Sequence, residues 1–120
     1  MRQQRPSSPY RGQQIAEVIH RTIGQAFLKE IEVPFGSFVT ISKVELDPER
    51  KHAKIFLTVL PDGVALSTFR AIKNQTGTAQ HKLNTTLRTR PVPKIAFLLD
   101  KGEEKRHRMD EILDQIDFPA

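Results

Sequence analysis

The sequence contains no cysteine among its 120 residues, and this absence excludes two kinds of site. Without thiols the chain can form neither a disulfide framework nor a thiolate metal site. Long apolar runs are also missing: the longest are IFLTVL and IAFLL, whereas a membrane-spanning helix needs about 20 apolar residues. Because no apolar segment follows the basic N-terminus, we expect a protein that is not exported by an ordinary signal, does not enter a membrane and acts in the cytoplasm.

Acidic residues are absent from two stretches, although the whole chain has 14 Asp and Glu against 19 Lys and Arg. Neither residues 1–16 nor residues 63–99 contain an Asp or a Glu. The longer stretch carries six positive charges, at Arg70, Lys73, Lys82, Arg88, Arg90 and Lys94. Segregation of basic residues is typical of a protein with a polyanionic partner. A solvated helix face with a charge bias by chance is the alternative at this point.

Motifs for catalysis are missing as well. The four histidines lie on different predicted elements without HExxH spacing, at His20, His52, His81 and His107. The chain has neither GxSxG nor the phosphate-binding GxxxxGK[ST]. Paired carboxylates such as Glu103 and Glu104, or Asp110 and Asp114, belong to a charge-rich helical segment, where such groups are usually solvated. We therefore expect no enzyme activity, no cofactor and no metal.

The N-terminal half predicts a basic arm, a helix and a β-hairpin. Residues 1–11 combine basic charge with turn-forming residues and no apolar period, so we expect a flexible basic arm before a domain spanning residues 12–118. Apolar residues recur at helical spacing from Ile15 to Ile31. Two runs rich in β-branched and aromatic residues, FVTISKVEL and HAKIFLTVL, then flank an Asp-Pro turn, which indicates two antiparallel strands.

A long helical stretch follows the hairpin, over about residues 64–89. Its apolar residues fall on one stripe at ~100° per residue: Phe69, Ile72, Ala79, Leu83 and Leu87. A straight helix of this length would reach ~39 Å, more than a domain of this size comfortably covers, so we expect a break near Gly77. The same indexing places Arg70 and Arg88 beside Gly77 on a separate, basic face.

Two further elements complete the prediction. VPKIAFLLD, preceded by Pro91, reads as a short third strand, and helical spacing of apolar residues predicts a last helix over about residues 103–116. The order α-β-β-α-α-β-α indicates a single α+β domain, with a three-stranded sheet and helices on one face.

This order, with a basic helix pair after the hairpin, resembles the type II KH domain, although the GxxG loop of that fold does not occur. The more specific resemblance is to the ribosome-binding factor A family, bacterial assembly factors whose KH-like fold carries an A-x-G interruption in place of that loop. The matching stretches, in order, are KEIEVPFGSFVTISKVELDPERKHAKIFLTVL, the Thr76–Gly77 pair, RTRPVPKIAFLLD and RHRMDEILDQI. Gln75 stands where the family usually has the alanine of A-x-G, and Arg106 where a glycine is common.

The resemblance implies a non-catalytic factor that binds the immature small ribosomal subunit and its ribosomal RNA near the decoding region, and assists late maturation and processing of that RNA. It also implies a monomer with no membrane partner. At the break, Gly77 would supply unusual torsions and let an RNA backbone approach two helix ends. The RNA-binding candidates are Arg70, Lys73, Thr76, Gly77, Lys82, Arg88, Arg90 and Lys94. A KH-like module that binds another structured RNA or a protein partner is the alternative.

Overall fold

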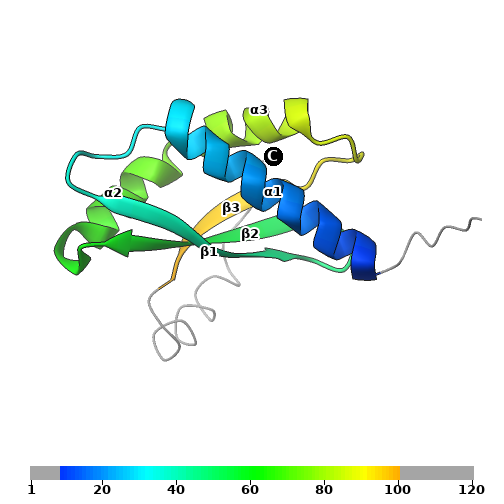
Figure 1. The fold of residues 1–120 in the computed structure, drawn as a ribbon, viewed down its shortest axis with the longest axis horizontal. Coiled ribbons are helices and arrows are strands. Elements are labelled where there is room, and N and C mark those ends of the chain that lie inside the picture. The colour runs from blue at the N-terminus through cyan, green and yellow to red at the C-terminus, as the bar shows by residue number, and fades with distance from the viewer. Residues whose placement is uncertain (1–8, 101–120) are drawn as a thin grey trace, which may run out of the picture.

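The helices and strands follow one another in the predicted order in the computed structural model, which describes residues 9–100 (Figure 1). The elements are helix α1 (Pro9–Lys29), strands β1 (Phe38–Leu46) and β2 (His52–Leu60), the 3-10 helix η1 (Asp62–Val64), helices α2 (Ala65–Lys73) and α3 (Thr76–Thr86), and strand β3 (Lys94–Leu99). The α+β class and the interrupted helix are therefore confirmed. The helix predicted over residues 103–116 lies outside the described residues.

The first helix begins at Pro9 and takes in the last three residues that had been assigned to the basic arm. Proline suits the first position of a helix, because its φ is already helical and its missing N–H would have had no intrahelical acceptor. Arg11 is thus part of helix α1. The rest of the predicted arm, residues 1–8, lies outside the described part of the chain.

The sheet has the order β1-β2-β3 and is mixed. Strands β1 and β2 pair antiparallel, as predicted, whereas β3 lies parallel to β2 on its other side. The register of β1 shifts between Ile41 and Lys43, and there the hydroxyl of Ser42 hydrogen-bonds to that of Thr58 at 2.8 Å. The expected inner face of β2 is buried and consists of Ala53, Ile55, Leu57 and Val59.

The core lies between this inner face and the three α-helices, which all cover the same side of the sheet (Figure 1). Ile19 and Ile23 of α1, Ile72 of α2 and Leu83 of α3 are fully buried there. The apolar stripe predicted across residues 64–89 thus packs into the core, even though two helices carry it. No helix within residues 9–100 has the length and apolar character needed to cross a membrane.

The interruption between α2 and α3 falls at residues 74 and 75, near Gly77 as predicted. Gly77 is the second residue of α3, and its φ is not in the left-handed region. A Cβ added to Gly77 would meet nothing within 4 Å. The expectation that Gly77 supplies torsions closed to other residues is therefore wrong, because an ordinary helical residue would fit its backbone.

The break is held by the side chain of Gln75, the residue that departs from the family pattern. Its Oε1 accepts a hydrogen bond from the backbone N–H of Glu32 at 2.8 Å, and its Nε2 donates to the carbonyl oxygen of Glu32 at 2.8 Å. The same Nε2 also donates to the carbonyl of Ala71 at 3.1 Å. This amide clamp joins the end of α2 to the loop that follows α1, and an alanine could not form it.

Candidate nucleic-acid interface

A groove of about 480 Å³ runs between α1 and the end of α3. The two helices pack side by side over the sheet (Figure 1). The residues that line the groove are Arg11, Gln14, Ile15, Val18 and Arg21 from α1, and Thr86, Leu87, Arg88 and Thr89 from the end of α3. Among the described residues, three arginines and no carboxylate therefore line one depression.

The α1 side of the groove follows from helical spacing. Arg11, Gln14, Val18 and Arg21 recur every three or four residues, so they share one face of the helix. The neighbouring stripe, which includes the fully buried Ile19, packs into the core and fixes the rotation of the helix about its axis. The arginine stripe is consequently placed at the edge of the core, facing the end of α3.

The α3 side is fixed by a turn that leaves the helix. Leu87 is buried and adopts an extended conformation, with its N–H still donating to the carbonyl of Leu83 at 2.9 Å. Arg88 follows directly and is exposed. The guanidinium of Arg90 donates from Nη1 to the carbonyl oxygens of Leu87 at 2.7 Å and Thr89 at 3.0 Å. Arg90 thus braces the chain segment that presents Arg88.

The charge in the groove is not neutralised within residues 9–100, where Arg11, Arg21 and Arg88 form no ion pair. The N-terminus of α1 adds about half a positive charge and the C-terminus of α3 about half a negative one, so the helix dipoles nearly cancel. Three full positive charges remain. This arrangement suits a polyanion such as a phosphate backbone, which arginine can bind with two parallel hydrogen bonds.

A second basic cluster lies at the break between α2 and α3. Arg70 and Lys73 are exposed in the last turn of α2, and the hydroxyl of Thr76 donates to the carbonyl of Lys73 at 2.6 Å. Gly77 is exposed beside them, in the first turn of α3. Because the 11 residues of α3 span about 16 Å, Arg88 lies at the far end of that helix from Gly77. Helical indexing predicted a shared face for Gly77 and Arg88, but it says nothing of their separation along the axis, and the chain leaves the helix at Leu87 before it reaches Arg88.

The three remaining RNA-binding candidates, Lys82, Arg90 and Lys94, each make a contact within the protein through a side chain or the backbone. Lys82 is half-buried, and its Nζ lies 3.4 Å from a carboxylate oxygen of Glu30. Arg90 braces the turn after α3. Lys94 opens β3, and its backbone N–H donates to the carbonyl of Lys51 in the hairpin turn at 2.9 Å. The acid-free region 63–99 is therefore not one surface, because β3 lies buried in the sheet.

Sequence reasoning missed two of the three arginines that line the groove. Arg11 had been assigned to the flexible arm, and Arg21 had not been singled out at all. The pattern that could have revealed them was a polar stripe at helical spacing beside the apolar stripe of α1. What the sequence could not reveal was that α3 would end opposite that stripe.

Ionisable groups elsewhere do not form a chemical site in the described part of the chain, where no cluster of three His, Asp or Glu residues could hold a metal ion. Asp47 in the hairpin turn is structural: its Oδ1 accepts hydrogen bonds from the backbone N–H of Lys51 at 2.7 Å and of His52 at 3.1 Å. Partial burial raises the pKa of this carboxyl, but these bonds and the His52 ring outweigh that effect. The pKa of Asp47 therefore lies below its ordinary value of 3.8.

Comparisons with known proteins agree with this architecture. The family model for Ribosome-binding factor A matches residues 11–113. Proteins named Ribosome-binding factor A from Burkholderia mallei (strain SAVP1) and Burkholderia pseudomallei (strain K96243) are each 34% identical over 109 residues, which is 91% of this chain and 88% of theirs. A solution NMR structure of a Thermotoga maritima protein, a candidate ribosome binding factor A, superposes with a TM-score of 0.66 at 25% identity, covering 81% of this chain and 93% of that one.

Proposed function

The chain belongs to the ribosome-binding factor A family, and we propose that it binds the immature small ribosomal subunit through its ribosomal RNA and assists late maturation and processing of that RNA. The observation that carries this proposal is the groove between α1 and α3, where no described acidic side chain in the lining compensates Arg11, Arg21 and Arg88. The proposal places the protein in the cytoplasm as a monomer.

The groove residues have the properties of phosphate ligands. Arginine remains charged at any physiological pH, and its planar guanidinium matches the geometry of two phosphate oxygens. Gln14 and Thr89 add side-chain donors along the same depression, where they could bind further backbone oxygens, whereas the hydroxyl of Thr86 already donates to the carbonyl of Lys82 at 2.8 Å. Contacts of this kind fix the position of an RNA backbone but carry little sequence information. Recognition would then depend on the shape of the folded RNA.

The cluster at the break is the second proposed contact. Arg70 and Lys73 provide charge, while Thr76 and Gly77 leave the first turn of α3 open to solvent on that side. The first N–H groups of a helix have no intrahelical acceptor and favour an anion. Lys82, Arg90 and Lys94 remain in the proposal as weaker candidates, because the fold already uses Lys82 and Arg90 and places Lys94 beside the hairpin turn.

The proposed mechanism uses binding energy and involves no catalytic step. A protein that binds one RNA conformation better than another shifts the RNA toward it, by no more than the difference between the two binding free energies. A groove lined by fixed helices suits this role, since little has to be ordered when the RNA binds. Release follows when the mature RNA no longer offers the favoured conformation.

The salt dependence of binding tests the groove. We expect Arg21→Glu and Arg88→Glu to weaken binding to small-subunit RNA and to reduce the log–log salt slope by roughly 0.7 to 0.9 for each lost phosphate contact. Lys51→Glu is the matched control, because it makes the same charge change in the exposed hairpin turn. If both arginine variants keep the wild-type RNA affinity and salt slope while Lys51→Glu loses affinity, the groove is refuted. The RNA would then bind on the side of the hairpin.

A further inference from the structure

Large apolar side chains gather at the end of the sheet where β1 begins and β2 ends. Of the six exposed large hydrophobic residues in the described part of the chain, five belong to the segments that meet there: Phe35, Phe38, Leu60, Val64 and Leu66. Phe38 and Leu60 are direct cross-strand partners, exposed at 71% and 53%. We call these five residues the apolar end. Exposed hydrophobic residues that gather in this way mark interaction sites, whereas isolated ones do not.

The apolar end is held in place by the fold. The hydroxyls of Ser37 and Thr68 hydrogen-bond at 2.7 Å, which ties the segment before β1 to helix α2. The N–H of Val64 donates to the carbonyl of Pro61 at 3.1 Å, which closes the turn after β2. A partner would therefore meet a surface that is already ordered, and binding would cost little conformational entropy.

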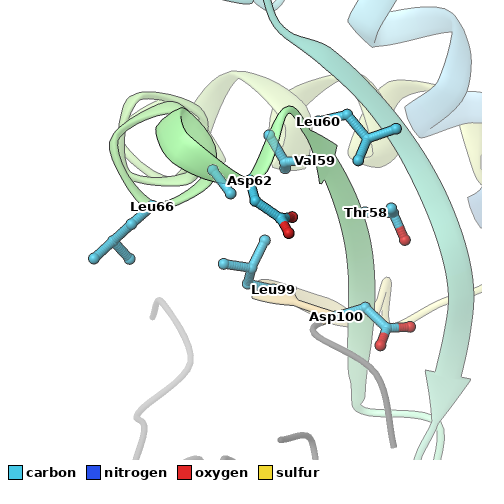
Figure 2. Close-up of a pocket in the computed structure, with 8 residues that line it drawn as sticks. Thr58, Val59, Leu60, Asp62, Leu66, Leu99 and Asp100 are labelled. Atoms are coloured by element: carbon cyan, nitrogen blue, oxygen red, sulfur yellow. The ribbon is translucent and has the colours of Figure 1, made fainter.

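A pocket of about 280 Å³ opens at this end, between β2, the end of β3 and the start of α2 (Figure 2). Leu60 and Leu66 belong to its lining, and Figure 2 shows Leu66 projecting outward at the rim. Two carboxylates, Asp62 and Asp100, lie on either side of Leu99, and no basic side chain of the described residues lines the pocket. The chemistry is thus apolar and acidic, the reverse of the groove between α1 and α3.

We propose that the apolar end docks a cationic protein segment that inserts an apolar side chain into the pocket and sets Lys or Arg beside Asp62. RNA is disfavoured here because two carboxylates repel phosphate and none of the described lining residues is basic. A second copy of the chain is disfavoured because a two-fold interface would bring each acidic rim against the same rim. This inference rests on the proposed function, which seats the protein on a particle made of both RNA and protein.

The test compares two binding substrates for the full-length protein: intact small ribosomal subunits, and small-subunit RNA stripped of its proteins. We expect Phe38→Ser, Leu66→Ser and Asp62→Lys each to lower affinity for intact subunits at least about fivefold, and to leave affinity for stripped RNA unchanged. Leu28→Ser removes a leucine in the last turn of α1 that is more exposed than Leu66, at 83% against 48%, and that does not line the pocket, so it should change neither.

The outcomes separate this inference from the proposed function. Apolar-end variants that bind intact subunits like the wild type, or that lose affinity equally for both substrates, would overturn the docking site. A wild-type dimer in sedimentation equilibrium that Phe38→Ser dissociates would assign the surface to a second copy and would also overturn it. If groove variants such as Arg21→Glu bind stripped RNA normally, the proposed RNA surface is refuted. The docking site is still supported in that case if Leu66→Ser loses affinity for intact subunits alone. Melting temperatures close to wild type show that each variant is folded.

Discussion

Replacing Gly77 with alanine should stabilise the protein and weaken its binding to RNA. The added methyl group meets nothing within 4 Å, and the backbone already has a helical conformation. An alanine in a helix interior is favoured over glycine by about 0.8 to 1.0 kcal/mol, and position two of α3 should show the lower part of the range of ~0.4 to 1 kcal/mol found for compatible Gly→Ala changes. For a chain of this size, that corresponds to a rise in melting temperature of roughly 2 to 4 °C.

Two other glycines provide matched controls. Gly24 lies within α1, where an added Cβ would likewise meet nothing within 4 Å, so Gly24→Ala should stabilise by about 1 kcal/mol and leave RNA binding unchanged. Gly36 has a φ of 89°, so Gly36→Ala should destabilise by about 1 to 2 kcal/mol. Thermal unfolding and RNA affinity, measured on the same samples, give the two quantities needed.

The result that would refute this reasoning is a lower melting temperature for Gly77→Ala. Such a loss would mean that the backbone at Gly77 needs torsions that alanine cannot adopt, against the helical geometry seen in α3. A stabilised variant with full affinity would refute only the second half, namely that an RNA backbone approaches Gly77 closely.

Two further predictions concern side chains that brace the fold. Gln75→Ala removes three hydrogen bonds of a partly exposed amide, so it should lower the free energy of unfolding, measured by urea titration, by about 1 to 2 kcal/mol. An unchanged free energy of unfolding would show that the amide clamp does not stabilise the break. Asp47→Asn should destabilise the hairpin by roughly 1 kcal/mol at neutral pH. Because folding lowers the pKa of Asp47, the carboxylate contributes fully to the free energy of unfolding above the unfolded pKa of about 3.8, and this contribution is lost as the pH falls through the folded pKa. A difference in the free energy of unfolding between Asp47→Asn and wild type that persists in stronger acid would contradict this.

The elements of this fold could be predicted because burial imposes a period on the sequence. In residues 52–60 every second side chain from Ala53 to Val59 enters the core, and the apolar stripe from Phe69 to Leu87 has helical spacing, so both patterns identify their elements locally. The parallel pairing of β3 with β2 is a property of the whole chain path, and no residue within β3 specifies it. Length suggested a break in the long helix and Gly77 indicated its neighbourhood, but neither identified residues 74 and 75.

The position of the break depends on a contact between residues far apart in the sequence. Gln75 binds the backbone of Glu32, 43 residues earlier, and a glutamine in a helical segment gives no sign of such a partner. The groove poses the same difficulty: Arg21 and Arg88 meet because α1 packs against α3. The charge distribution identified Arg88 because it lies in the acid-free region. It did not identify Arg21, because Arg21 lies four residues after Glu17.

The amide clamp also links the two proposed surfaces. The loop that contains Glu32 leads directly into Phe38 and the apolar end, while the break that contains Gln75 leads into α3 and the groove. A side chain that ties these segments together fixes the position of the proposed RNA surface relative to the proposed protein-docking surface. The two contacts also respond differently to salt, since phosphate contacts weaken steeply with ionic strength whereas apolar burial does not. With both proposed surfaces at a fixed separation, the protein would bind best to a particle whose RNA and protein lie at the matching separation. Particles in which RNA and protein have another relative position would bind more weakly.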